Sequence, residues 1–167
     1  MKKLTLSTIA TAGLLLASSS VMVMANAIET SSYKMVLIED TPGVDAIQSG
    51  DIDEGIALTK AAATSVIDQY TRNLNLCVGY TKLSKFDIAE EACTEAVEMA
   101  DRADKLPSMQ MRAYAYNNRG VMKLLAKDNV GALADFKKAA KATHEPIYKH
   151  NLSRLVAELN NTETGTL

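Results

Sequence analysis

The chain has 167 residues, of which 47% are hydrophobic and 5% aromatic, with two cysteines and a formal net charge of −2. The hydrophobic content excludes a mostly disordered protein. The absence of a basic block excludes an electrostatic surface for nucleic acid. Two cysteines are too few for a small fold held together by disulfides. Aromatic rings normally fill much of a protein core, so small side chains must take their place here.

Residues 1–27 have the order of a secretory signal peptide. Lys2 and Lys3 form a positive start, an apolar run extends from Leu4 to Ala17, and Ala25-Asn26-Ala27 is a small-x-small cleavage site. Cleavage would leave 16 Lys and Arg residues against 20 Asp and Glu, a net charge of −4. We therefore expect a bacterial protein, periplasmic or secreted, with no stable membrane insertion after cleavage. The alternative is an uncleaved membrane anchor.

The mature chain begins with residues that lack helical spacing. Residues 28–35 are expected to form a flexible lead-in. Met35–Ile38 is an apolar run that ends at the polar turn 39–43. Taken alone, this run is either a short strand or an extended segment lying on the domain.

From Gly43 onward, apolar residues recur at helical spacing and short turns separate them, which excludes a long parallel sheet. Ser84 or Asp87 is expected to cap one of these helices. The helices predicted in chain order are a short one ending at Ser49-Gly50, an Ala-rich one from Asp51 to about Asp68, two between Tyr70 and Ala103, and three more from Ser108 to about Ala126, from Val130 to Thr143 and from Glu145-Pro146 to about Asn160. Residues 161–167 are a polar tail.

A spacing of twelve between small residues recurs along the chain. Cys77 is followed after twelve residues by Ala89, and Gly120 is followed after twelve by Ala132. A fainter copy begins at Gly43. Small residues at this spacing let two antiparallel helices approach closely, and each pair then leaves an apolar face for a neighbouring pair to cover.

This pattern resembles the tetratricopeptide repeat (TPR) family, whose consensus is W-x2-L-G-x2-Y, then A-x3-F, then P. In the last unit Tyr116 stands at the Trp position, Gly120 at the Gly position, and Ala132 and Phe136 match A-x3-F. The resemblance implies an all-α fold: an α-solenoid of about three helical hairpins over residues 36–160. The first repeat is either truncated or merged into one long helix, and a plain helical bundle is the alternative for the whole pattern. The expected units are repeats at about 36–69, 70–103 and 113–146 and a capping helix at 146–160.

No motif indicates catalysis or a cofactor. GxSxG, HExxH, P-loop and GxGxxG patterns are absent from the sequence. His144 and His150 are six residues apart, so they do not share a helical face as metal ligands at i and i+4 would. We therefore expect no enzyme activity, no cofactor and no metal, and hold a small exported enzyme as the residual alternative.

Cys77 and Cys93 are predicted to be two buried free thiols. If Cys77 lies opposite Ala89, Cys93 lies one turn further along the axis, about 5–6 Å away. Added to a distance between helix axes of roughly 8–10 Å, this exceeds the reach of a disulfide. A bridge remains the alternative in an oxidising compartment.

The remaining functional feature is a surface. In this family the first helix of each pair lines a concave groove that holds a peptide or a helix. Asn117 and Asn118 can bond an extended backbone as donor and acceptor, whereas Tyr114 and Leu125 have the alternative of packing on a neighbouring helix. Lys82 is the one cation carried over, so recognition of a free carboxyl terminus is not expected. The resemblance places in the groove Thr71, Leu74, Asn75, Val78, Thr81, Lys82, Tyr114, Asn117, Asn118, Val121 and Leu125.

The sequence therefore predicts a non-enzymatic adaptor that binds a protein or peptide partner in this groove. The alternative is a structural envelope protein that self-assembles into a homo-oligomer through Met35–Ile38 or through an open end of the solenoid. Three units leave little spare stability, and an uncapped end exposes apolar surface.

Overall fold

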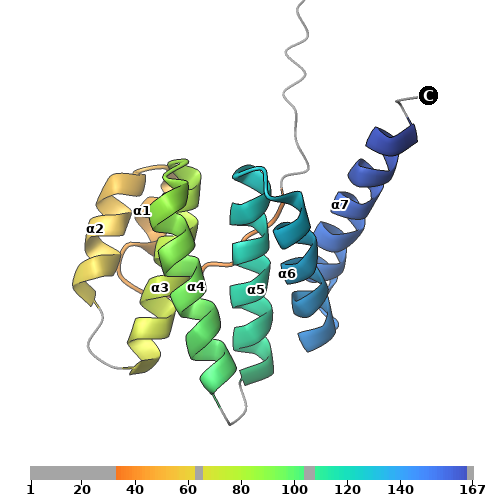
Figure 1. Cartoon of the computed structure of the whole chain (residues 1–167). Coiled ribbons are helices and arrows are strands. Elements are labelled where there is room, and N and C mark those ends of the chain that lie inside the picture. The colour runs from red at the N-terminus through yellow and green to blue at the C-terminus, as the bar shows by residue number, and fades with distance from the viewer. Residues whose placement is uncertain (1–32, 63–65, 104–107, 165–167) are drawn as a thin grey trace, which may run out of the picture. The chain divides into compact units, whose positions relative to one another are not determined.

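The structure is a computed structural model that describes residues 33–62, 66–103 and 108–164 (Figure 1). The chain divides into two units, residues 1–31 and residues 32–167, and all the described residues belong to the second unit. The predicted signal peptide at residues 1–27 and residues 28–32 of the predicted lead-in lie outside the described residues.

The described residues form seven α-helices and no strand, so the prediction of an all-α fold is confirmed. Each helix packs on the next one in the chain, and α5 also contacts both α3 and α7. The helices lie side by side (Figure 1). Their bounds are α1 (Val44–Ser49), α2 (Ile52–Ala62), α3 (Val66–Lys82), α4 (Phe86–Arg102), α5 (Ser108–Leu125), α6 (Asn129–Ala142) and α7 (Pro146–Thr164).

The turn between α3 and α4 differs from the sequence prediction of a cap by Ser84 or Asp87. The residue before α4 is Lys85, and no side chain caps that helix. Ser84 instead has a φ of 56° and ends α3. The N–H of Ser84 bonds the carbonyl of Thr81, and that of Lys85 bonds the carbonyl of Tyr80. This pair of bonds is a Schellman motif, so Ser84 terminates one helix rather than starting the next.

Small residues let the helices approach closely, as the sequence indicates. A Cβ atom added to Gly120 in α5 would lie 2.7 Å from two ring carbons of Phe136 in α6. Ala132 and Ala139 on α6 are fully buried, as is Phe136. The hairpin of α5 and α6 therefore depends on a glycine where a ring of the facing helix lies against the backbone.

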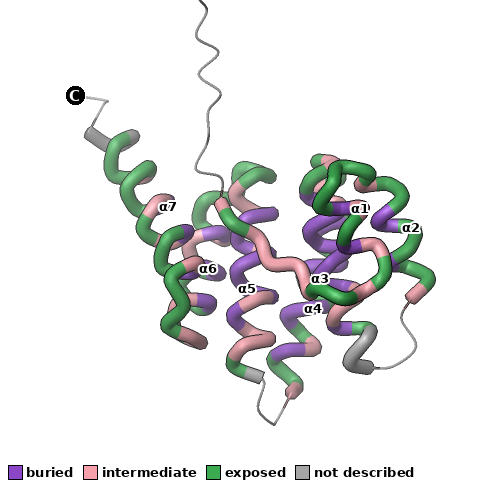
Figure 2. The backbone as a smooth tube through the Cα atoms, turned by 180° about the vertical axis from the view of Figure 1, so that it is seen from behind, coloured by how far each residue is buried: buried purple, intermediate pink, exposed green. Residues whose placement is uncertain are grey.

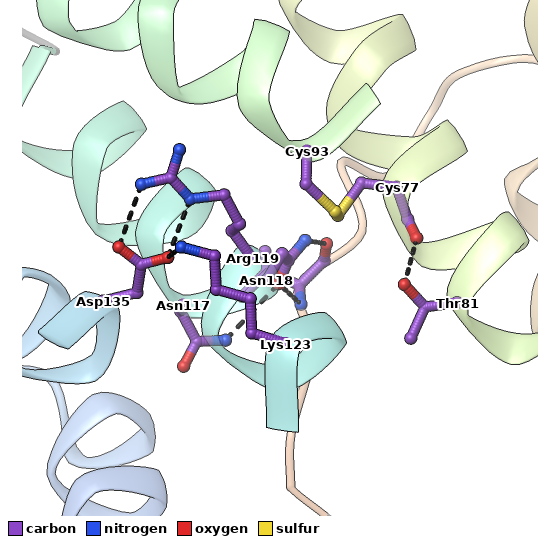
Figure 3. The surroundings of a disulfide bond; sticks show 9 residues. Cys77, Thr81, Cys93, Asn117, Asn118, Arg119, Lys123 and Asp135 are labelled. Carbon is purple, nitrogen blue, oxygen red and sulfur yellow. Dashed lines mark hydrogen bonds and ion pairs between the residues drawn. A yellow bond between two sulfur atoms is a disulfide. The ribbon is translucent and has the colours of Figure 1, made fainter. Parts of the chain in front are cut away.

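Cys77 in α3 and Cys93 in α4 form a disulfide (Figure 3), so the prediction of two free thiols is wrong. Their Cα atoms are 4.8 Å apart, and both residues are fully buried. The prediction counted the whole distance between the helix axes. Each Cα on a facing side lies about 2.3 Å from its own axis toward the other helix. That geometry reduces an interaxial distance of roughly 8–10 Å to about 3–5 Å between facing Cα atoms.

A buried carboxylate joins α5 to α6 (Figure 3). Asp135 accepts from Arg119 through both carboxylate oxygens, at 2.7 and 2.9 Å. The ammonium of Lys123 lies 3.2 Å from one of these oxygens. The side chain of Asp135 is 3% exposed, so its charge depends on these two cations.

Candidate functional site

Residues 33–38, here called the strap, form an extended segment that crosses the helices (Figure 2). Lys34 is exposed and the other five residues are half-buried. Of the two alternatives for Met35–Ile38, the extended segment lying on the domain is confirmed. The first helix of the described residues begins at Val44, next to Gly43, from which the sequence predicts helical spacing.

Asparagine side chains hold the backbone of the strap from one side. Asn151 in α7 accepts from the N–H of Lys34 at 2.9 Å and donates to its carbonyl at 2.8 Å. Asn118 in α5 accepts from the N–H of Val36 at 2.8 Å and donates to its carbonyl at 2.7 Å. Each amide therefore satisfies both backbone groups of one residue.

Asn75 in α3 repeats this arrangement at Ile38. Its carbonyl accepts from the N–H of Ile38 at 2.9 Å, and its amide donates to the carbonyl of Ile38 at 3.3 Å. The same amide donates to the hydroxyl of Thr41 at 2.9 Å. The strap thus runs from α7 across α5 to α3, opposite to the order of the helices in the chain.

A fourth asparagine supports the first contact. Asn117 donates to the carbonyl of Lys34 at 2.7 Å and accepts from the amide of Asn151 at 2.7 Å. Asn75, Asn117, Asn118 and Asn151 are all 0% exposed. Buried polar groups need hydrogen-bond partners, and the strap backbone supplies them.

The spacing of these contacts follows from the geometry of an extended chain. In such a chain the backbone groups of every second residue face the same side. The bonded residues are Lys34, Val36 and Ile38, two apart in each case. The primary amide carries both a donor and an acceptor, so it pairs with one residue's N–H and C=O regardless of its side chain. The asparagines therefore bond the strap through its backbone.

Tyr33 provides recognition of a side chain at one end of the strap. Its ring stacks on Phe136 with a centroid distance of 5.8 Å, and the guanidinium of Arg154 lies 5.1 Å from its centroid. Its hydroxyl donates to Glu158 at 2.7 Å. Burial, and then the hydrogen bond to Glu158, raises the pKa of Tyr33. An aromatic ring therefore occupies this end of the strap's contact surface.

The described part of the lead-in predicted at residues 28–35, Tyr33 to Met35, lies against the helices. The ring of Tyr33 packs on Phe136, and two asparagines bond the backbone of Lys34. The polar composition of residues 28–34 indicated solvent exposure. It did not reveal that backbone groups would be bonded from the helices.

The apolar side chains of the strap pack against different clusters of the helical core. Met35 packs against the clusters that contain Met122 and Phe136. Val36 and Ile38 pack against the cluster that contains Leu74. The strap is thus fixed by apolar contacts with these clusters and by asparagines along its backbone.

The structure places the residues proposed for the groove in four locations. Asn75, Asn117 and Asn118 bond the strap or its turn. Leu74 is a fully buried core residue, and Tyr114 packs beside the same cluster, which was the alternative for Tyr114. Thr71 lines a hollow under the 40–42 turn. A hollow beside the strap is lined by Val78, Thr81, Lys82, Val121 and Leu125, together with Met35 and Leu37.

Two contributors were missed by sequence reasoning, Asn151 and Tyr33. A signal for Asn151 was available, because Asn75 and Asn118 each stand two residues before the small residue of their repeat. Asn151 follows Asn118 after 33 residues, close to one repeat length. For Tyr33 no sequence signal existed, because its contacts come from two helices: Phe136 lies in α6, and Arg154 lies in α7.

Within the described ranges, no group of three or more His, Cys, Asp or Glu residues could hold a metal ion. In that same part of the chain, no helix is long and apolar enough to cross a bilayer. Comparisons of the chain with family models, with curated proteins and with solved structures give no match.

Proposed function

We propose that this protein is a non-enzymatic adaptor whose groove holds an extended polypeptide segment. The observation that carries the proposal is the bidentate bonding of alternate strap residues by Asn151, Asn118 and Asn75. A surface that satisfies both backbone groups of alternate residues suits an extended peptide. These hydrogen bonds need no particular side chain on the bound segment, so they set which of its residues face the asparagines. The apolar and aromatic contacts set which sequences bind best.

We further propose that the helices form a TPR-like solenoid. Three features support this: the hairpin of α5 and α6 closes at Gly120, α3, α5 and α7 each supply a strap-bonding asparagine, and α3 and α7 both contact α5. In this proposal α3 and α5 are the first helices of two repeats, and α7 caps the end.

The proposed location is the bacterial periplasm or the extracellular space. The disulfide between Cys77 and Cys93 supports export, because disulfides persist in oxidising compartments and are rare in the cytosol. The signal peptide at residues 1–27, with cleavage after Ala27, is the sequence feature behind this proposal.

The test compares capture of envelope proteins by wild type with capture by the double variant Asn75→Ala plus Asn118→Ala. The matched control is Asn73→Ala. Asn73 is also a buried asparagine of α3, but its amide donates to Glu95 on α4 at 2.7 Å. We expect the double variant to lose partners that the control retains. Equal capture by all three proteins would contradict the proposal.

A further inference from the structure

We infer that the strap is an intramolecular occupant of the partner's groove, so that a partner segment must displace it to bind. This inference rests on the proposed function and adds two statements to it: the free protein is closed, and the strap describes the chemistry of the partner.

The strap uses the hydrogen-bonding capacity of the groove. Each of Asn75, Asn118 and Asn151 has its carbonyl and its amide engaged with the strap. A second extended backbone could not use the same donors and acceptors at the same time. Partner and strap therefore compete for one site.

The strap is tethered beside the groove by the residues that follow it. It is joined to α1 by the short turn 39–43, in which Gly43 has a φ of 92°. On its outer edge, the backbone groups of Met35 and Leu37 make no hydrogen bond within the part of the chain that the structure describes. A tethered segment competes with a free one through its effective local concentration.

The contacts of the strap define the partner by its chemistry. The first position takes an aromatic ring, between Phe136 and Arg154. The second position is unrestricted, because Lys34 is exposed. The third, fourth and sixth positions take apolar side chains, as Met35, Val36 and Ile38 do. The partner is therefore an uncharged or weakly charged extended segment with an aromatic residue at its amino-terminal end.

The experiment measures binding of a fluorescent peptide with the strap sequence, acetyl-Tyr-Lys-Met-Val-Leu-Ile-amide, to the full chain. Val36→Pro removes the N–H that Asn118 accepts, and so releases the strap while leaving every groove residue intact. The matched control is Leu37→Pro, which removes an N–H without a hydrogen bond in the described structure. Val36, the residue before this proline, lies in the extended strap, and an extended residue tolerates a proline after it.

We expect Val36→Pro to bind the peptide at least about fivefold more tightly than wild type, because the fraction of open groove rises when a strap bond is lost. Leu37→Pro should stay near wild type. Adding Asn118→Ala to Val36→Pro should weaken binding of the peptide again. Tyr33→Ser opens the groove through a different contact, so it carries the same expectation if circular dichroism shows that Val36→Pro does not fold.

Two results would overturn the inference and are distinguishable. If wild type, Val36→Pro and Tyr33→Ser bind the peptide equally tightly, the groove is open in the free protein. The proposed function then stands without the competition from the strap. If no variant binds the peptide, neither the competition nor the recognition of extended segments by this groove survives.

Discussion

At the scale of single residues, asparagines bond the backbone of the strap, and one buried carboxylate of α6 pairs with two cations of α5. Asn117 and Asn118 could be predicted as backbone-binding residues, because only a side chain with both donor and acceptor suits that role in a groove. Asn151 stands about one repeat length after Asn118, but its contact with the strap also depends on where α7 lies. Sequence periodicity within a helix does not place that helix against another one.

Asp135 provides the first prediction. Asp135→Asn should lower the free energy of unfolding by about 2–3 kcal/mol, because it leaves the partly buried charges of Arg119 and Lys123 without a counter-charge. The control is Asp53→Asn, which removes an exposed ion pair to Lys85 at 3.6 Å and should change stability by less than about 0.5 kcal/mol. Urea unfolding measures both. Equal effects of the two variants would contradict the assignment of a structural role to the buried carboxylate.

Tyr116 predicts a loss of stability in alkaline solution. Burial, followed by the hydrogen bond to Asp101, raises the pKa of Tyr116 from 10.0 to about 12. A raised pKa means that the folded protein favours the neutral phenol. This contribution to stability is fully present below pH 10 and is lost as the pH rises from about 10 to about 12.

The measurement is the unfolding free energy at a series of pH values from about 9 to about 12, a range that includes both the ordinary and the raised pKa of the tyrosine. Tyr116→Phe cannot ionise at this position, so its stability should fall less steeply with pH than that of wild type. Parallel pH profiles for the two proteins would show that Tyr116 does not contribute.

At the scale of elements, the helices were predictable and their relative placement was less so. The helical periodicity identified α5 and α6 closely, since apolar spacing and turn residues are local properties. The contact between Cys77 and Cys93 depends on which faces of α3 and α4 meet and how closely their axes approach. Neither quantity is local, and an estimate from axis distances alone gave the wrong answer.

The disulfide predicts a reductant-sensitive stability. Its two cysteines are 16 residues apart. Closing a loop of this size contributes about 3 kcal/mol in the chain-entropy model. Reduction should therefore lower the urea midpoint of wild type, and the Cys77→Ala plus Cys93→Ala variant should be insensitive to reductant. Free thiols in unreduced, denatured wild type would contradict the bond.

At the scale of the whole described unit, the strap connects distant parts of the chain. Lys34 is bonded by Asn151, 117 residues away, and Ile38 by Asn75, 37 residues away. The sequence showed an apolar run and a separate set of groove asparagines, and left both without a partner. Their combination could not be predicted, because an extended segment carries no periodic signal of the surface on which it lies.

Self-assembly through Met35–Ile38 would compete with the contacts that this run makes within its own chain. Met35–Ile38 packs on the helices of its own chain, so assembly through this run would require the strap to leave its groove. Light scattering at micromolar concentration should give the mass of one chain. A stable dimer or larger species that is abolished by Val36→Pro would favour exchange of straps between copies.

The most direct test of the central claim is residue-resolved amide hydrogen exchange in the strap. If asparagines hold alternate residues, the amides of Lys34, Val36 and Ile38 exchange slowly and those of Met35 and Leu37 exchange fast. Asn118→Ala should speed exchange at Val36 most. Uniformly fast exchange from Lys34 to Ile38 in wild type would contradict the account, because the strap would then not occupy the groove.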